Sequence, residues 1–376
     1  MLLDQTSRFI NFVANLRALD QTATDMTKPA NKDVVQTQAT DWASRAMPTM
    51  DDVARATGFS QMTVSRAFLD SSPIRKETRE KILEAAARLG YFHNKAASTL
   101  ASPRSRAFGI ILPTLQDSIY LPFVAGAREV FEHNGADYLL QSIDYARKRE
   151  PHAIGPLVSQ RVRAILLPSI GHTRETQRLL SSIPIPIIEV GNLPKRPIHF
   201  AAGHSDFDAG YLATQHLIDT GRRHLAIICG YVAQTSNARD RLAGFRKAIA
   251  KAGLELSAGQ IAEVEHTVEA GPQALARLLE ARTKIDGLVV AGEIWGAPVL
   301  LDLLRRARRV PKDISVISIG EVELGPYLPV TMSYVSLPRY ETGRAAAELA
   351  LAVSRGEEVK QPIVKLPVDL VRHQST

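Results

Sequence analysis

Side chains able to bond nucleic acid gather in one short stretch of this chain, residues 48–68, PTMDDVARATGFSQMTVSRAF. Its second half carries, in order, Ser60, Gln61, Met62, Thr63, Ser65 and Arg66. An amide and a guanidinium bond the edges of bases in the major groove, and hydroxyl groups bond phosphates. These residue types therefore allow hydrogen bonding to DNA, provided that one helix presents them together on its exposed side.

The flanking residues predict a first short helix that ends in a tight turn. Thr49 and Asp52 have the spacing of a capping box, in which each side chain bonds the backbone of the other residue. The apolar face of this helix consists of Val53, Ala54 and Ala56. Gly58 then allows a turn without crowding from a Cβ atom.

Two further helices are expected after this turn. Ser60 can cap the second helix, and Val64 and Phe68, four residues apart, mark its buried side. The third helix is expected to begin at residues 72–73 and to run to about Leu89. Its apolar residues at helical spacing are Ile82, Leu83, Ala86 and Leu89. An amphipathic hairpin in an ordinary domain is the alternative, but three such helices in succession favour a small DNA-binding module.

This order of motifs resembles the lactose-repressor (LacI) family of bacterial transcriptional regulators. The family's start, roughly DVA…AGVS…TVSR, corresponds to residues 52–54, 57–60 and 63–66. Its continuation, TREK…LGY.PN..A..LA, corresponds to residues 78–81, 89–91, 94, 97 and 100–101. His93 stands where the family usually has proline, which makes the entry to the next segment less rigid.

The resemblance implies a role for each of these side chains on double-stranded operator DNA. Gln61, Met62 and Arg66 should face base edges. The implied phosphate contacts are Ser60, Thr63, Ser65 and Asn94. Ala97 and Leu100 should belong to a hinge helix that orders on DNA, with Leu100 wedged into the minor groove to bend the duplex. Two subunits would act together, as a homodimer.

Composition agrees with such a protein and excludes other classes. The chain has 376 residues, 45% of them hydrophobic, and a net charge of +7, which suits two or three domains and a polyanionic partner. Its single cysteine, Cys229, excludes an internal disulfide and a cysteine-based zinc site. No apolar run reaches the roughly 18 residues of a membrane span, and the N-terminus lacks an apolar signal core. We therefore expect a cytoplasmic protein with no membrane partner.

The segment boundaries follow from local composition. Residues 1–46 predict a disordered arm because polar residues dominate residues 21–40. The DNA-binding domain is expected at residues 47–92 and the hinge at residues 93–105. From residue 106 to 376, short apolar strands alternate with helix-length segments, which predicts parallel sheets covered on both faces. The expected buried strands are AFGIILP, ADYLLQSI, VRAILLPS, IPIIEVG, RHLAIICG, DGLVVAG and DISVISIG, and the expected helices include residues 122–134, 207–220, 238–252 and 295–308.

Motifs of several enzyme classes are missing from the sequence. It contains no GxGxxG after the first strand, no GxxxxGK[ST] phosphate loop, no GxSxG elbow and no HExxH helix. The ten histidines are scattered without the spacing of metal ligands. We therefore expect no cofactor, no metal and no enzymatic activity.

Residues 106–376 also resemble the LacI family, whose effector domain has a two-lobed periplasmic-binding-protein fold with two doubly wound parallel sheets. The first lobe would comprise residues 106–203 and 337–365, and the second lobe residues 204–334 and 366–376. A small molecule would bind between them, at the carboxyl ends of the strands.

Several positions in this region match the family's effector contacts. Arg241 lies in RLAGF, which matches the family's RL.GF, whose arginine faces the effector. The family's Asn-Asp pair becomes Gly292-Glu293, and its aspartate after the strand ISVISIG becomes Glu321. The implied effector-binding residues are Arg241, Glu293, Trp295, Glu321 and Tyr340. The alternatives are a surface ion pair for Arg241, lobe core for Trp295 and the interlobe hinge for Tyr340.

The nearest branch of the family is that of the gluconate-operon repressors, which share MTVSR at residues 62–66, GIILP at 109–113 and IPIIE at 185–189. The resemblance implies a sequence-specific regulator, most simply a repressor, controlled by a sugar acid such as gluconate or its phosphate. A neutral sugar, a nucleoside or no effector at all is the alternative. A solute-binding protein or an enzyme on the same two-lobed fold are the rivals from other classes.

Overall fold

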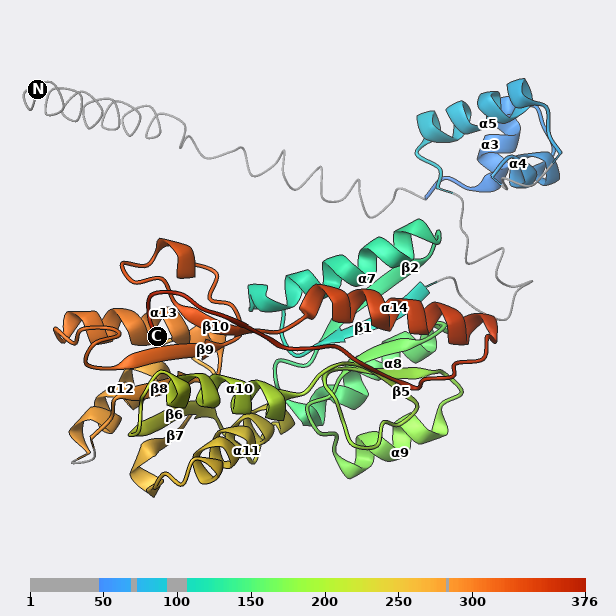
Figure 1. Cartoon of the computed structure of the whole chain (residues 1–376). Coiled ribbons are helices and arrows are strands. Elements are labelled where there is room, and N and C mark those ends of the chain that lie inside the picture. The colour runs from blue at the N-terminus through green and yellow to red at the C-terminus, as the bar shows by residue number, and fades with distance from the viewer. Residues whose placement is uncertain (1–46, 69–72, 93–106, 282–283) are drawn as a thin grey trace, which may run out of the picture. The chain divides into compact units, whose positions relative to one another are not determined.

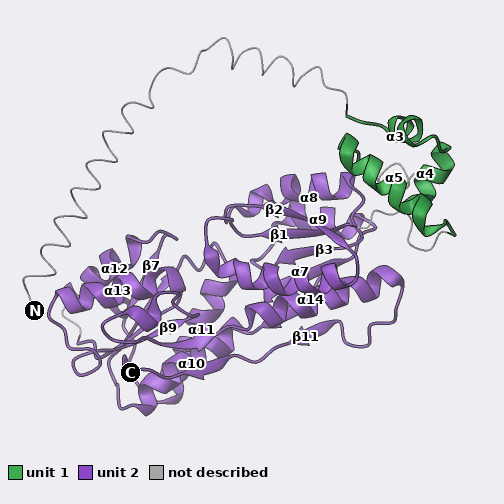
Figure 2. Cartoon of the chain, turned by 90° about the horizontal axis from the view of Figure 1, so that it is seen from above, with its two compact units in different colours: residues 1–98 green, residues 99–376 purple. Residues whose placement is uncertain are grey.

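A computed structural model describes residues 47–68, 73–92, 107–281 and 284–376 (Figure 1). The chain divides into two compact units, residues 1–98 and residues 99–376 (Figure 2). The expected arm, residues 1–46, lies outside the described residues, as do the hinge residues Asn94, Ala97 and Leu100. Within the described part, no helix is both long enough and apolar enough to cross a membrane.

The first unit contains three described helices. They are α3 (Met50–Thr57), α4 (Gln61–Ala67) and α5 (Lys76–Leu89). The predicted capping box is confirmed, because the Thr49 hydroxyl accepts from the Asp52 backbone N–H and the Asp52 carboxylate accepts from the Thr49 backbone N–H. The predicted turn at Gly58 is also confirmed, with a φ of 74° in the left-handed region. Ser60 caps α4 by accepting from the Thr63 backbone N–H.

The third helix differs from its prediction. It begins at Lys76, after Arg75 in an extended conformation, rather than at residues 72–73. A ψ of 138° at Arg75 lies outside the helical region, so the helix cannot include Pro73, although proline is favoured at the first position of a helix. Ile82 and Ala86 are buried against Val53 and Val64, but the side chains of Ala56, Leu83 and Leu89 are exposed. Three helices bury only one narrow face each, and these three side chains fall beyond it.

The described residues of the second unit form two six-stranded sheets. In the first sheet the strand order is β11-β5-β4-β3-β1-β2, and in the second it is β12-β10-β9-β8-β6-β7. The first sheet consists of β1 (Ala107–Leu112), β2 (Asp137–Ser142), β3 (Ile165–Pro168), β4 (Ile187–Asn192), β5 (Phe200–His204) and β11 (Ile363–Lys365). The second consists of β6 (Leu225–Gly230), β7 (Ile261–Val264), β8 (Gly287–Val290), β9 (Ser315–Ile319), β10 (Ser333–Ser336) and β12 (Asp369–Val371). All pairings are parallel except that of β10 with β12.

Helices cover both faces of each sheet (Figure 1). The α-helices of this unit are α7 (Leu121–His133), α8 (Glu150–Ser159), α9 (Arg174–Ser182), α10 (Asp206–Asp219), α11 (Ser236–Lys251), α12 (Ala270–Glu280), α13 (Glu293–Arg305) and α14 (Arg339–Arg355). The 3-10 helices are η2 (Ser118–Tyr120), η3 (Arg147–Arg149), η4 (Ala258–Gln260) and η5 (Gly325–Tyr327). On the first sheet, α7 and α14 cover one face and α8 and α9 the other; on the second, α10 and α11 face α12 and α13 across the sheet.

Adjacent residues of one strand contribute to opposite cores. Ile110 of β1 packs under α7 and α14, while Ile111 packs under α8 and α9. This is why the strands of a doubly wound sheet are apolar throughout instead of alternating with polar residues. The predicted strand ADYLLQSI is an exception: β2 is an edge strand, and Leu139 and Leu140 are 36% and 39% exposed. The sequence prediction of a buried strand is therefore wrong at this position.

The chain passes between the sheets three times. It leaves the first sheet after β5, returns between β10 and α14, and crosses again between β11 and β12. These connections place the carboxyl ends of the central strands of both sheets around one cleft, which holds the candidate effector site.

Candidate functional sites

The exposed side of α4 carries the residues predicted to face bases. Gln61, Met62 and Arg66 are all exposed, Met62 by 64%. Gln61 Nε2 donates to Asp51 Oδ1 of α3 at 2.9 Å, a contact that sequence analysis did not foresee. Val64 is fully buried and fixes the rotation of α4 against α3 and α5. The helix therefore presents an amide, a thioether and a guanidinium to solvent on one side.

Two of the residues predicted to contact phosphates, Ser60 and Thr63, also form hydrogen bonds with each other at the start of α4. The Ser60 hydroxyl accepts from the Thr63 backbone at 3.2 Å and pairs with the Thr63 hydroxyl at 2.9 Å. Ser65 is half-buried. Because each hydroxyl has one donor and two acceptor sites, Ser60 and Thr63 keep hydrogen-bonding capacity beyond the cap.

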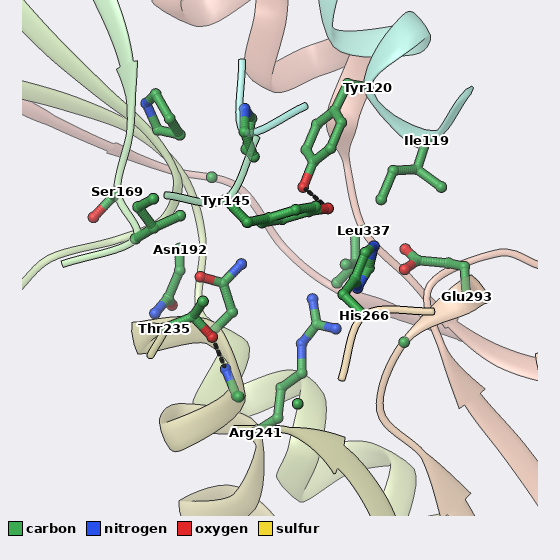
Figure 3. A pocket seen from close by; sticks show the side chains of 18 of the residues that line it. Ile119, Tyr120, Tyr145, Ser169, Asn192, Thr235, Arg241, His266, Glu293 and Leu337 are labelled. Carbon is green, nitrogen blue, oxygen red and sulfur yellow. Dashed lines mark hydrogen bonds between the residues drawn. The ribbon is translucent and has the colours of Figure 1, made fainter. Parts of the chain in front are cut away.

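The second site is a cavity of about 180 Å³ between the two sheets (Figure 3). The ends of β1, β3 and β4 contribute from the first lobe, and the ends of β6 and β8 from the second. Aromatic and aliphatic side chains form much of its wall, with a few polar groups between them. Such a composition is typical of pockets for small organic ligands.

Arg241 of α11 lies in this pocket and is only 8% exposed. Its Nε donates to Asp206 Oδ1 at 2.6 Å and its Nη1 to the Ala291 carbonyl at 3.1 Å. Burial raises the pKa of Asp206, but the Arg241 charge and the hydrogen bond from His204 outweigh it and lower that pKa to about 2. Arg241 is thus a buried ion-pair partner of α10 whose guanidinium also points into the cavity (Figure 3).

A second arginine, missed by sequence analysis, faces the same pocket. Arg339 at the start of α14 forms an ion pair with Glu293 at the start of α13, so the pair joins the two lobes. Burial lowers the pKa of Arg339 to about 10, and the nearby charge of Arg241 contributes. Gly320 makes room for the Glu293 carboxylate: a Cβ atom there would lie 1.8 Å from Glu293 Oε1.

Hydroxyl and imidazole groups join the lobes at another side of the pocket. Asp117 Oδ2 accepts from the Tyr145 hydroxyl and from His266 Nε2, both at 2.8 Å. The Tyr145 hydroxyl also lies 2.9 Å from the Tyr120 hydroxyl. Burial raises the pKa of Tyr120 to about 12 and raises that of Tyr145 as well. Both phenols therefore stay neutral at physiological pH and offer hydrogen bonds to a ligand.

The other predicted effector contacts have mixed outcomes. Glu293 and Trp295 line the pocket, but Trp295 is 2% exposed, packs in the second lobe's core and donates from Nε1 to the Thr267 carbonyl. Glu321 is exposed and lies outside the pocket lining, because the left-handed turn at Gly320 leads the chain out of the cleft. Tyr340 also lies outside it, with its hydroxyl donating to Glu129 of α7. One step along α14 turns the side chain away, so Arg339 occupies the cleft instead.

Known protein families match both units. The family model for bacterial regulatory proteins of the lacI family matches residues 49–94. The family model for the periplasmic binding protein-like domain matches residues 214–376.

Similar proteins span nearly the same length. The HTH-type transcriptional regulator GntR of Pseudomonas aeruginosa is 29% identical over 330 residues, which cover 88% of this chain and 96% of the relative. The crystal structure of a LacI-family transcriptional regulator from Silicibacter pomeroyi has a TM-score of 0.78 at 26% identity, over 87% of this chain and 99% of the other. The structure of the transcriptional regulator CelR in complex with cellobiose has a TM-score of 0.65 at 25% identity, over 88% and 100%.

These matches agree with the exposed recognition helix, the capped turn before it and the cleft between two parallel sheets. The chain is therefore a transcriptional regulator of the LacI family, in which a helix-turn-helix domain precedes a two-lobed periplasmic-binding-protein-like domain.

Proposed function

We propose that this regulator binds operator DNA as a homodimer, with α4 of each subunit in the major groove of one half-site. The observation that carries this proposal is the exposed side of α4, where Gln61, Met62 and Arg66 project into solvent. Ser60, Thr63, Ser65 and Asn94 bond phosphates, and Ala97 and Leu100 form the hinge in the minor groove. Repression is the simplest mode of action for such a protein.

A sugar acid or its phosphate is our proposed effector. Two guanidinium groups, those of Arg241 and Arg339, line one small cavity and lie close enough to influence each other. Guanidinium binds carboxylate and phosphate in bidentate fashion. The phenols of Tyr120 and Tyr145 provide hydrogen-bonding groups for the hydroxyls of a polyol.

A neutral sugar is the second candidate effector. Asp206 and Glu293 already neutralise the two arginines, so an uncharged ligand would leave the ion pairs intact. The relative CelR is in complex with cellobiose, a neutral sugar. The two candidates differ in whether a ligand anion replaces Glu293 on Arg339.

No cofactor or turnover is part of the proposal, since the relatives are transcriptional regulators and the pocket needs only to bind. A protein that acts on chromosomal DNA would work in the bacterial cytoplasm. An effector would favour one arrangement of the lobes, and it can shift this equilibrium only by its difference in affinity for the two arrangements.

DNA recognition is tested by Arg66→Ala in the full-length protein. Loss of a base contact should cost roughly 1–3 kcal/mol of operator binding and relax sequence preference at one position. Fluorescence anisotropy at fixed salt concentration with operator and scrambled duplexes measures both effects. Arg88→Ala, which removes an exposed charge near the end of α5, is the matched control. Equal losses in the two variants would reduce Arg66 to a non-specific phosphate contact.

The effector is tested by thermal-shift measurements with gluconate, 6-phosphogluconate, glucose and cellobiose. A ligand at 100 times its dissociation constant stabilises the native state by about 2.7 kcal/mol. We expect stabilisation by the anions and its loss in Arg339→Gln. Stabilisation by glucose or cellobiose alone would show that the effector is a neutral sugar and not a sugar acid. Turnover of any bound compound would contradict the expectation that the protein is not an enzyme.

A further inference from the structure

The segment between β3 and α9 bonds the second lobe directly through two backbone carbonyls, and a third, that of Gly171, is linked to it through Arg147 of the first lobe. The Ser169 carbonyl accepts from the Ser236 hydroxyl at 2.7 Å, and the Ile170 carbonyl accepts from the Ser236 backbone N–H at 3.2 Å. The Gly171 carbonyl accepts from Arg147 Nη1 at 3.2 Å, and Nη2 of the same guanidinium donates to the Ala233 carbonyl at 3.2 Å. We call residues 169–171 the latch.

The latch lies against the candidate effector pocket. Ser169 and Ile170 line the cavity from the first lobe, and Thr235, Asn237 and Ala238 line it from the second (Figure 3). Ser236 is the first residue of α11, whose backbone N–H has no partner within the helix. The latch bonds therefore satisfy a helix terminus and join the two lobes at the same time.

A buried group of three side chains follows the latch. His172 Nδ1 lies 2.8 Å from Glu150 Oε1, and His172 Nε2 lies 3.2 Å from Glu189 Oε1. The three side chains are 5%, 0% and 4% exposed for His172, Glu150 and Glu189. Glu189 Oε2 also accepts from the Ile198 backbone at 2.7 Å. We call Glu150, His172 and Glu189 the clasp.

Two carboxylates from different elements fix the ring of His172, the residue that directly follows the latch. Glu150 begins α8, where the helix dipole favours a carboxylate, and Glu189 is fixed within β4. Arg147, three residues before Glu150, bonds the latch itself. Because His172 directly follows Gly171, the position of its ring restricts the direction of the latch carbonyls.

Electrostatics favour the charged form of His172 in this position. Burial acts to lower its pKa, but hydrogen bonds to Glu150 and Glu189 outweigh burial and raise the pKa to about 9. The charged groups bonded to this segment are the two glutamates and Arg147. An uncharged ring could donate only one N–H, which would leave one of the two carboxylate oxygens that face it, Glu150 Oε1 or Glu189 Oε1, without the donor it now has.

We propose that Glu150, His172 and Glu189 act as a buried clasp that positions residues 169–171 to bond Ser236, so that the clasp sets how readily the cleft opens. His172 is a positioning residue: it is not among the residues that line the pocket, its ring bonds Glu150 and Glu189 of the first lobe, and it acts through the latch carbonyls. The proposal does not depend on the identity of the effector, because the bonds concerned exist between the lobes themselves.

The experiment measures the distance between the lobes with spin labels. Cysteines that carry the labels replace Arg178 of α9 and Lys247 of α11, which are both exposed. The native Cys229 should not react with the label, because it is fully buried and burial raises the pKa of its thiol to about 12. Ser236→Pro removes both latch bonds from the second lobe, and proline is tolerated at the first position of a helix. His172→Gln removes the charge of the clasp, and His152→Gln changes an exposed histidine of α8 as the matched control.

At pH 7 we expect Ser236→Pro to lengthen and broaden the distance distribution, and His172→Gln to shift it in the same direction. The double variant should equal Ser236→Pro alone, because the proposal assigns the effect of His172 to the two Ser236 bonds and not to the link from Gly171 through Arg147 to Ala233. His152→Gln should match the wild type. An additive double variant, or a His172→Gln distribution identical to that of the wild type, would overturn the proposal.

A pH series of the doubly labelled protein without further substitutions tests the clasp even if His172→Gln fails to fold. Since the pKa of His172 is raised, its contribution is present at pH 7 and is lost as the pH rises through about 9. The distribution should then approach that of Ser236→Pro, whose own distribution should not respond. A wild-type distribution constant from pH 7 to 10, or an equal response in Ser236→Pro, would contradict the role of the clasp.

Discussion

The pair of Asp206 and Arg241 illustrates how one side chain can serve both a lobe and its ligand pocket. Asp206 is fully buried at the start of α10, and its Oδ2 has no hydrogen-bond partner within the described residues. His204 Nδ1 is likewise buried there without a partner. Asp206 itself does not line the cavity and reaches it only through Arg241, so the carboxylate acts on the site by fixing the guanidinium.

Replacement of Asp206 by asparagine should destabilise the second lobe strongly. It leaves the Arg241 guanidinium buried without its counter-charge, and breaking a buried pair typically costs about 3–5 kcal/mol. Urea unfolding followed by circular dichroism measures the change. Asp208→Asn on the same helix is the matched control, because Asp208 pairs with Lys365 at the surface and such pairs contribute at most about 1 kcal/mol. Similar losses in the two variants would contradict the importance of burial.

Acid should reveal the same pair in the unmodified protein. The pKa of Asp206 is lowered from 3.8 to about 2, so its contribution is present above pH 4 and is lost as the pH falls towards 2. The full loss, complete only below pH 2, amounts to about 2 kcal/mol in the free energy of unfolding, and more than half of it falls between pH 5 and pH 2.5. Comparison of urea unfolding at pH 5 and pH 2.5 in wild type and Asp206→Asn isolates this contribution. Parallel losses in the two proteins would assign the acid sensitivity to other carboxylates.

Some site residues could be predicted from the sequence and others could not. Arg241 lies in RLAGF, whose resemblance to the family's RL.GF implies that its side chain faces the effector, and it does line the pocket. Arg339 and His266 reach the pocket only because distant segments fold against each other. No local pattern separates Arg339 from Tyr340, one residue further on, which faces α7 instead.

At the scale of elements, glycines allow two pairs of helices to approach each other closely. A Cβ atom on Gly244 of α11 would lie 2.1 Å from the Phe207 carbonyl oxygen of α10. A Cβ atom on Gly343 of α14 would lie 2.0 Å from the Phe123 carbonyl oxygen of α7. Each lobe thus relies on one helix pair in which backbone meets backbone, α10 with α11 and α7 with α14 (Figure 1).

Gly244→Ala should therefore push α10 and α11 apart. Overpacking of a well-packed core costs about 1–3 kcal/mol, and we expect the upper end because the opposing atoms are backbone. Gly155→Ala on α8 is the control: a Cβ atom there meets nothing within 4 Å, and alanine favours a helix over glycine by up to about 1 kcal/mol. Thermal unfolding of both variants measures the difference, and an unchanged melting temperature for Gly244→Ala would contradict the close contact.

The sequence predicted the type of most elements but not their edges. All seven predicted strands exist because buried parallel strands are continuously apolar. The strands β10 (SYVS), β11 (IVK) and β12 (DLV) lack the continuous apolar run from which the four-residue strands β3 and β8 were predicted. β2 was predicted as buried from the same apolar character, yet position at a sheet edge depends on chain topology and not on the strand's own residues.

For the whole regulator, Leu100→Ala separates DNA bending from DNA recognition. Leu100 lies outside the described residues, and its minor-groove role is part of the proposed function. The variant should reduce the bend of operator DNA because an apolar wedge no longer unstacks the base step. Energy transfer between dyes at the two ends of an operator duplex measures the bend. Arg66→Ala is the contrasting variant, with weaker binding but an unchanged bend once bound.

The discontinuous first lobe has a consequence for synthesis on the ribosome. Residues of β1 and α7 share one core with Ala346, Ala347 and Ala350 of α14, which begins roughly 230 residues after β1. At the usual pace of translation, this separation lasts on the order of ten to fifty seconds. Most of the second lobe is therefore synthesised while the part of this core that α14 covers is still exposed and only α7 packs on that face of the first sheet. Throughout that interval the chain depends on chaperones, or on the slow rate of encounter with other chains, to avoid aggregation.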